Sequence, residues 1–571
     1  MTRVRQHWPA IAIALVIGAI TAGPFLFFQM SSGYQGISLM GTDAEEHYLA
    51  RMQEVYEGFP SQGNVFLPNK DVPPIEPGLG EWLQAKTGHL LLLSASAVET
   101  YGKFLLPVLI ALLVYALAYT LSASRAAGVL AAAAVILGDP FISDPRALID
   151  VFRGVASHTG FLIYSRPVSP EISALFLFGA LVLIARLFFS ARPEMLPSRR
   201  YASLCAITFL TGLSLYVSFY TFAFLGAIEL VMFIYELVHR RYRRAIEVGA
   251  AGIGALVLAI PFVLNYLHVI ADPAYATASG RFGLVLSHAP VVGMLLLLLL
   301  TAAWVLPKSL GEVRRFILIG AFALLLVLNQ QVLTGRELQV GHFHWYVTRP
   351  FVGISGAVLF VALTERFVRL RVVRVVVYVV VLMVLMFGAG MVQISSYRAT
   401  VPAARAAQAY APLFTYLNHE ALATVWADRT LSLYIPIYTH DDAPNNSYAE
   451  YYLVSQNYLI TRMLLEYRLQ GVTPTDTRTV MLRDRADISA RLFGVYWRDT
   501  AGSYAAIPDA LIDTYAQQYK DAYAEPLTTL FKTLGITEIV WDASVDGPGE
   551  ALTKEGLQEE TILGRFNIYH I

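Results

Sequence analysis

Three neighbouring residues near the start of the chain could do acid–base chemistry. Asp43, Glu46 and His47 lie in the stretch GTDAEEHYLARMQEVYEG. If this stretch is helical, spacings of three and four place these side chains on neighbouring positions of one face. Glu45 instead follows Thr42 at the spacing of a capping box, so we expect it to close the helix N-terminus. Because a carboxylate can accept a proton from a reacting hydroxyl, Asp43 and Glu46 are the predicted catalytic residues.

Two later segments, 143–170 and 334–350, are rich in arginine and histidine. An Arg-Pro pair stands at or near the end of each, at 166–167 and 349–350, and proline is favoured in the first turn of a helix. A guanidinium group matches phosphate oxygens in a bidentate way. The residues that these considerations predict to bind substrate are His47, Arg166, His342, His344 and Arg349.

Two other interpretations of these side chains stay open. Arginines at a membrane edge also extend toward lipid headgroups. A His-x-His pair such as His342 and His344, joined by a carboxylate, could hold a divalent metal ion, but the sequence leaves that ligand set incomplete. We therefore assign no metal site and no cofactor.

The composition indicates a membrane protein. The chain has 571 residues, of which 56% are hydrophobic and 15% charged, and its mean hydropathy is +0.54. Lys+Arg and Asp+Glu are both 42, and the single Cys205 excludes a disulfide framework within the chain. With about 20 apolar residues per helix, the sequence predicts about eleven spans, at 8–29, 103–121, 126–142, 171–190, 201–217, 219–238, 245–268, 287–306, 315–333, 349–365 and 373–395.

The Lys/Arg distribution predicts the orientation. One set of connections is short and basic, for example HRRYRR at 239–244, which indicates the cytoplasmic side. The N-terminus belongs to that side, and its apolar segment is expected to remain as an uncleaved first span. Everything after residue 396 is then extracytoplasmic, in a multi-pass protein of the plasma membrane.

The fold expected is a polytopic α-helical membrane protein with a C-terminal extracytoplasmic α/β domain. The domains are 1–396 and 397–571. In the first outer loop, 30–102, two amphipathic helices joined by a Pro-rich turn are expected to lie on the membrane surface. In the C-terminal domain, helical periodicity occurs in 403–420 and 447–469, and strand patterns in 423–428, 537–542 and 566–571.

A carboxylate beside arginines at the outer membrane face suits sugar transfer from a polyprenyl-phosphate carrier. The acceptor hydroxyl must lose a proton, and the leaving phosphate needs fixed cations. One alternative is a lipid-linked sugar flippase or transporter, for which Glu229 in the sixth span is the candidate ionisable group. Another is a non-catalytic component of envelope polysaccharide assembly that docks through the C-terminal domain.

The stretch TDAEEHYLARM and the layout of residues 1–396 resemble the GT-C superfamily of membrane glycosyltransferases. That family includes protein O-mannosyltransferases, the aminoarabinose transferases of lipid A and the catalytic subunit of oligosaccharyltransferase. Asp43 matches the catalytic Asp of the family's first outer loop, whereas Ala44 stands where several members have Glu. The resemblance implies a glycosyltransferase, inverting in mechanism, that uses a polyprenyl-phosphate-linked hexose or pentose and a lipid, glycan or protein acceptor, without nucleic acid.

Overall fold

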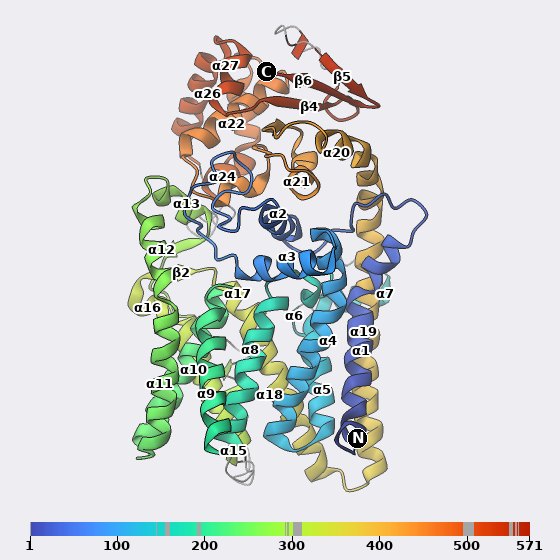
Figure 1. Cartoon of the computed structure of the whole chain (residues 1–571), viewed down its shortest axis with the longest axis vertical. Helices are drawn as coiled ribbons and strands as arrows, with labels where there is room; N and C mark the ends of the chain where they lie inside the picture. Colours follow the sequence, from blue (N-terminus) through green and yellow to red (C-terminus); the bar gives the residue numbers. More distant parts are fainter. Residues whose placement is uncertain are drawn as a thin grey trace.

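The protein is a bundle of long helices with a smaller α/β region at one end (Figure 1). This computed structural model describes residues 2–143, 145–154, 160–190, 196–291, 293, 296–297, 299–300, 311–494, 507–547, 552–553, 557 and 559–571. The N-terminus lies at the end of the bundle away from the α/β region, and the C-terminus lies within that region. The predicted fold class, a polytopic helical protein with a C-terminal α/β part, is confirmed.

Seven stretches of helix among the described residues are long and apolar enough to cross a membrane. A further pair, α11 and α12, would make an eighth span across a 43° bend. The helices of the bundle are α1 (Thr2–Gln29), α4 (Ala95–Ser122), α5 (Arg125–Ile136), α8 (Glu171–Ile184) with a π-turn η2 (Ala185–Phe189), α9 (Pro197–Ser214), α10 (Phe219–Val238), α11 (Tyr242–Leu258), α12 (Ile260–Ala271), α15 (Gly311–Leu328), α16 (Gln330–Thr334), α17 (Val340–Phe343) with a π-turn η4 (His344–Thr348), α18 (Arg349–Phe367) and α19 (Arg371–Ala407).

Outside 287–306, the predicted spans fall on helices, some of them with a break or a turn at one end. The ranges 126–142 and 201–217 fall on α5 and α9, which do not reach the length and apolarity of the seven spans. Half of 287–306 lies outside the described residues, and residues 287–291 at its start are not helical. The count of eleven spans therefore stays a prediction, as does the orientation of the bundle.

The connections at the α/β end carry short elements. Two helices occur in the first loop, as predicted, and a two-stranded antiparallel sheet joins β1 to β2 with Leu284 opposite Leu338. The elements of these connections are α2 (Glu45–Tyr56), α3 (Leu79–Leu91), α6 (Asp139–Ser143), α7 (Pro145–Arg153), the 3₁₀-turn η1 (Ile163–Ser165), α13 (Tyr275–Arg281), β1 (Leu284–Leu286) and β2 (Arg336–Leu338).

The apolar face of α2 packs against protein and not on the membrane surface that we predicted. Met52 and Val55 are buried in one cluster with Ile437 and Tyr452 of the C-terminal region. Figure 1 shows α2 between α3 and the α/β region. Hydrophobic burial is not directional, so an amphipathic face read from sequence does not identify its partner. In α3, by contrast, Leu90 is 83% exposed, and the position of this helix on the membrane surface stays a prediction.

The start of α2 also differs from the predicted capping box. Glu45 does accept from the backbone N–H of Thr42 at 2.9 Å, but the helix begins at Glu45. Its N-cap is Ala44, which has a φ of 55°. Asp43 therefore lies ahead of the helix and does not share a helical face with Glu46 and His47. The Glu45 carboxylate is held by Lys103 at 3.0 Å, a contact that no local pattern encodes.

The C-terminal region contains a four-stranded sheet in the order β3-β4-β6-β5. Strand β3 is parallel to β4, and the other pairs are antiparallel. Its elements are the 3₁₀-turn η5 (Gln408–Tyr410), α20 (Ala411–Leu417), β3 (Val425–Trp426), α21 (Arg429–Tyr438), the 3₁₀-helix η6 (Ser447–Tyr451), α22 (Gln456–Leu469), α23 (Thr477–Arg483), α24 (Arg485–Phe493), α26 (Asp509–Tyr523), α27 (Leu527–Thr533), β4 (Glu538–Asp542), β5 (Glu559–Leu563) and β6 (Phe566–His570).

The α/β region is joined closely to the bundle. Helix α19 continues without a break past residue 396, where we placed the domain boundary, to Ala407. Lys70 of the first loop pairs with Asp442 of the α/β region at 2.6 Å and with Glu54 of α2 at 3.1 Å. The first loop is thus held between the bundle and the α/β region, where a cavity opens.

Candidate functional site

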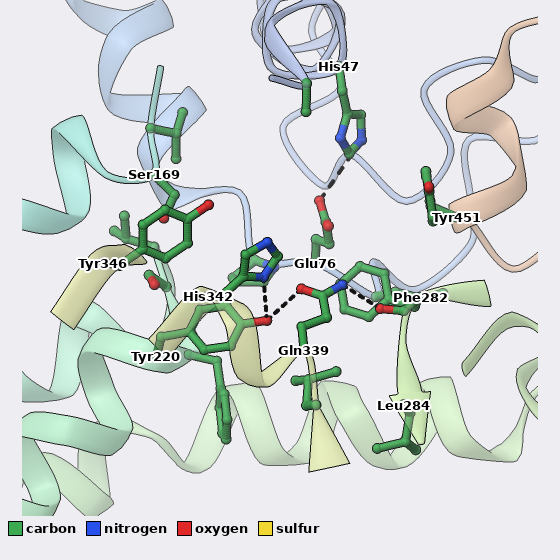
Figure 2. A pocket seen from close by; sticks show the side chains of 18 of the residues that line it. His47, Glu76, Ser169, Tyr220, Phe282, Leu284, Gln339, His342, Tyr346 and Tyr451 are labelled. Atoms are coloured by element: carbon green, nitrogen blue, oxygen red, sulfur yellow. Dashed lines mark hydrogen bonds and ion pairs between the residues drawn. The ribbon is translucent and has the colours of Figure 1, made fainter. Parts of the chain in front are cut away.

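A cavity of about 660 Å³ lies where the bundle, the first loop and the α/β region meet. It is large enough for a small ligand, and aromatic residues make up much of its wall. Figure 2 shows that its side chains come from the first loop, the bundle helices, the strand β1 and the C-terminal region. Of the predicted site residues, it is lined by Asp43, His47, Arg166 and His342.

Asp43 presents an accessible carboxylate to this cavity. Its side chain is 73% exposed, and its Oδ2 lies 3.4 Å from a guanidinium nitrogen of Arg166. The backbone of Asp43 is fixed, because Arg166 Nε donates to its carbonyl oxygen at 2.6 Å. The same arginine thus holds the main chain and leaves the carboxylate open to a ligand.

Arg166 is a buried cation with nearly all its donors occupied. It is 7% exposed and donates to the carbonyl of Ser169 at 3.0 Å and to the hydroxyl of Tyr346. Its guanidinium also lies over the ring of Tyr48, 5.2 Å from the centroid. These contacts make Arg166 an organiser of the site, with its charge directed at Asp43.

His47 stays uncharged in this setting. Burial, with the nearby charges of Arg51 and Arg166, holds the pKa of His47 well below its usual range. Its Nε2 lies 3.0 Å from the Tyr452 hydroxyl, and its ring stacks on Tyr448 at 5.0 Å between centroids. A neutral imidazole cannot supply charge to a phosphate, so His47 contributes shape and hydrogen bonding.

Behind His47, the first loop is held together by a buried arginine. Arg51 is fully buried and donates to Glu81 at 2.6 Å, to Glu76 at 3.2 Å and to the carbonyl of Pro77 at 2.9 Å. These three bonds tie α2 to the turn ahead of α3. Both carboxylate residues also line the cavity, and they are acids that the sequence analysis did not single out.

His342 belongs to a chain of hydrogen bonds along the bundle side of the cavity (Figure 2). Its Nδ1 lies 3.0 Å from the Tyr220 hydroxyl, which donates to Gln339 Oε1 at 2.6 Å. Gln339 Nε2 in turn donates to the carbonyl of Phe282 at 2.6 Å. This chain connects α10, the segment ahead of α17 and the turn before β1, so it fixes the shape of the wall.

Three predicted residues do not belong to the cavity wall among the residues that the structure describes. They are Glu46, His344 and Arg349. Arg349 instead pairs with Asp139 at 3.0 Å. The segment that carries His342 and His344 is helical, so the pair does not adopt the extended geometry that would place both rings on one face. Within the described part of the chain, no group of three His, Cys, Asp or Glu side chains could hold a metal ion.

Glu46 is half-buried, and this burial raises its pKa from 4.5 to about 7. The folded protein then binds this proton more tightly than the unfolded chain, so Glu46 contributes stability below about pH 4.5 that is lost as pH rises through 7. Replacing Glu46 by Gln is expected to raise the Tm at pH 8 by roughly 1–3 °C, with little change at pH 4.5. Thermal unfolding of both proteins at the two pH values tests this, and an equal pH slope in both would contradict it.

The cavity also contains residues that we did not predict as site residues. Arg336 on β2 lines it, and among the described residues no carboxylate lies within ion-pair distance of its guanidinium. Tyr448 and Tyr451 reach it from η6 in the C-terminal region. Arg336 could have been predicted from the sequence, since it lies in the same basic segment as His342. The two tyrosines could not have been predicted as site residues, because no local sequence pattern shows that η6 faces the bundle.

Solved structures share this architecture at low sequence identity. The arabinofuranosyltransferase AftD from Mycobacteria aligns over 100% of this chain and 40% of its own, with 14% identity and a TM-score of 0.51. The chain has the GT-C fold.

Two further structures align with lower scores. ArnT from Cupriavidus metallidurans in the apo state aligns over 100% of this chain and 98% of its own, with 12% identity and a TM-score of 0.46. The oligosaccharyltransferase AglB from Archaeoglobus fulgidus, in complex with an inhibitory peptide and a dolichol-phosphate, aligns over 95% and 70%, with 11% identity and a TM-score of 0.45. No protein-family model and no curated protein matches the sequence. The GT-C fold therefore rests on the arrangement of helices and not on sequence similarity.

Proposed function

We propose that this protein is a membrane glycosyltransferase that moves a sugar from a polyprenyl-phosphate donor to an acceptor hydroxyl. The observation that carries the proposal is one cavity with the accessible Asp43 carboxylate and the guanidinium of Arg336 in its walls. In this proposal the reaction takes place at the α/β end of the bundle, on the side that the Lys/Arg distribution predicts to be extracytoplasmic. The fold shared with an arabinofuranosyltransferase agrees with sugar transfer.

Asp43 acts as the general base. The acceptor hydroxyl oxygen forms a bond to the anomeric carbon while the bond from that carbon to the phosphate oxygen breaks. The proton of the hydroxyl passes to the Asp43 carboxylate, and polyprenyl phosphate leaves with the bonding electron pair. A single displacement of this kind inverts the anomeric configuration. Positioned acid–base catalysis contributes about 10²–10⁴-fold to such a step.

Arg336 receives the donor phosphate. Its side chain is exposed toward the cavity, and a guanidinium matches two phosphate oxygens at once. Apolar side chains of the bundle end, including Phe219, Phe262 and Leu284, line the same cavity and suit the first isoprene units of the carrier. Arg166 is already bonded within the protein, so it holds Asp43 in place and is not the first partner of the phosphate.

The transport alternative has less support. Glu229 accepts a hydrogen bond from the Thr211 hydroxyl at 2.8 Å on the adjacent helix. It lines only a void of about 10 Å³, which is no larger than one water molecule, and it does not line the main cavity. A buried acid bonded to its neighbour is a packing feature, so we do not assign it a transport role.

The donor assignment is tested by binding. Replacing Arg336 by Gln is expected to weaken binding of undecaprenyl phosphate to the purified protein by about 10–100-fold, the effect of losing a charged hydrogen-bond donor. Arg398 is exposed, lies on α19 and does not line the cavity, so Arg398→Gln is the matched control and should bind like wild type. Undecaprenyl phosphate that binds equally well to both variants would contradict the phosphate role.

The reaction itself is tested with the reconstituted protein. In proteoliposomes, labelled sugar is expected to pass from polyprenyl-phosphate-linked hexoses or pentoses to an acceptor, and the lipid product is expected to be polyprenyl phosphate. Movement of intact donor across the bilayer without sugar release would instead support the flippase alternative.

A further inference from the structure

One short element of the C-terminal region reaches the cavity. The 3₁₀-helix η6 contributes Tyr448 and Tyr451, which are the lining residues from that region in the described part of the chain. Tyr448 stacks on His47 with an angle of 8° between the rings. Figure 2 shows Tyr451 beside the cavity, on a ribbon separate from the bundle helices. The C-terminal region therefore supplies part of the wall near Asp43 and His47.

This element is fixed from the bundle side by a buried arginine. Arg281, at the end of α13, is fully buried. Its Nε donates to the carbonyl of Glu450 at 2.7 Å, and its two Nη atoms donate to the carbonyl of Val454 at 2.7 Å and to Gln456 Oε1 at 3.0 Å. All three acceptors belong to η6 or to the residues that follow it. A buried cation is costly unless its donors are satisfied, so this geometry is specific.

A second buried arginine fixes the same element from the C-terminal side. Arg462 on α22 donates to the carbonyls of Pro444 and Asn446, each at 3.1 Å, and pairs with the carboxylate of Glu450. The Asn446 amide donates to the carbonyl of Ser432 at 2.8 Å. The two tyrosines are thus presented on a segment whose backbone is held on both sides. Such pre-organisation is what a binding surface needs.

Tyrosines also line the bundle side of the cavity, for example Tyr220 and Tyr346, so this wall is distinguished by its place beside the loop of Asp43 and His47. A tyrosine offers a flat apolar face and a hydroxyl that donates and accepts. A sugar ring offers the matching surfaces, with an apolar C–H face and an edge of hydroxyls. The base must lie next to the hydroxyl that it deprotonates, and Tyr448 packs on His47 of the same loop as Asp43. The proposed donor contacts, Arg336 and the apolar bundle residues, come from other elements of the same cavity.

We propose that Tyr448 and Tyr451 form the acceptor subsite and that the acceptor is a carbohydrate, bound with a sugar ring against these tyrosines. The inference rests on the proposed function, because it takes Asp43 as the base. It gives the C-terminal region a role in acceptor recognition. The segment around η6, braced by Arg281 and Arg462, sets the distance between the acceptor ring and the Asp43 carboxylate.

The test uses the full-length protein in detergent with undecaprenyl phosphate present to occupy the donor side. The probes are methyl glycosides of common hexoses and pentoses, observed by saturation-transfer NMR. Wild type is expected to saturate at least one glycoside. Tyr448→Ala and Tyr451→Ala are each expected to lower that signal by about fivefold, the effect of losing an aromatic contact, and Tyr451→Phe should keep most of it. Tyr523→Ala, an exposed tyrosine of α26 outside the cavity, is the matched control.

Each outcome decides the proposal. Signals that are equal in wild type and in both alanine variants would overturn it, as would the absence of any glycoside signal. A serine-containing tripeptide that saturates in place of the glycosides would identify a peptide acceptor and also overturn it. A melting curve and undecaprenyl phosphate binding within about twofold of wild type show that a variant is folded. Wild type that binds glycosides but not undecaprenyl phosphate would reject the donor assignment and leave the sugar subsite standing.

Discussion

Replacing Asp43 by Asn is expected to lower the kcat of sugar transfer by about 10²–10⁴-fold, the usual contribution of a positioned general base. Asparagine keeps the size of the side chain but cannot take up the proton of the acceptor hydroxyl. The backbone carbonyl that Arg166 holds at 2.6 Å is unchanged, so the loop should keep its position. The measurement is the initial rate of transfer from a polyprenyl-phosphate-linked sugar in proteoliposomes, with donor binding measured alongside.

The controls separate the base from the loop that carries it. Asp71 is an exposed acid of the same loop that does not line the cavity, so Asp71→Asn should transfer sugar at the wild-type rate. Undecaprenyl phosphate should bind to Asp43→Asn as it does to wild type, because Asp43 is not a phosphate ligand. Wild-type turnover by Asp43→Asn would reject the assignment of the base.

Replacing Lys103 by Met is expected to destabilise the protein by about 3–5 kcal/mol, the cost of leaving buried carboxylates without their cation. Lys103 is fully buried, as are Glu45, Glu99 and Glu171. Its ammonium pairs with Glu45 at 3.0 Å and with Glu99, and it donates to the carbonyl of Ser165 at 2.6 Å. One lysine is therefore the cation for several buried carboxyl groups in a site that water does not reach.

The same lysine positions the loop that carries Asp43, the proposed base. Glu45, which it holds, also accepts from the backbone N–H groups of Gly41 and Thr42, and Ser165 adjoins Arg166. Lys103 thus joins the segment of Asp43 to the segment of Arg166. In any Lys103→Met protein that folds, kcat should fall while the affinity for undecaprenyl phosphate stays within about twofold, since no phosphate contact is lost.

The matched control removes an acid in place of the cation. Neither carboxylate oxygen of Glu171 has a hydrogen-bond partner among the described residues. Glu171→Gln reduces the excess of buried acids around Lys103, so it should leave the Tm unchanged or raise it. Melting temperatures in detergent compare the two variants, and a Lys103→Met protein as stable as wild type would refute the role of this cluster.

Much of the architecture could be predicted because it depends on local patterns. Apolar runs of membrane length indicate helices such as α10 at Phe219–Val238, which coincides with the predicted range. Strands β3, β4 and β6 fall within the three predicted strand segments. The remaining strand, β5 at Glu559–Leu563, was not predicted. Its sequence begins EET, and it lies at the edge of the sheet, where a strand needs fewer apolar residues than in the centre.

The composition of the cavity could be predicted only in part. Asp43, His47, Arg166 and His342 were identified by residue type and by their place beside predicted spans, and they do line one cavity. Arg349 met the same criteria but pairs with Asp139, which is 210 residues away in the sequence. Residue type shows that an arginine needs an anion, but only the packing of distant segments shows whether the protein already supplies one.

The sequence by itself determined that the chain crosses a membrane many times, that an α/β region follows the last span, and that an acidic loop follows the first. These properties come from hydropathy, helix and strand periodicity and charge, each of which acts over a few neighbouring residues. Tertiary structure alone decided that α2 is buried, that Arg336 faces the cavity without a carboxylate partner in the described part of the chain, and that Tyr448 and Tyr451 reach the site. The physical reason is that burial and ion pairing depend on which distant segments come together. The periodicity of neighbouring residues contains no information about those partners.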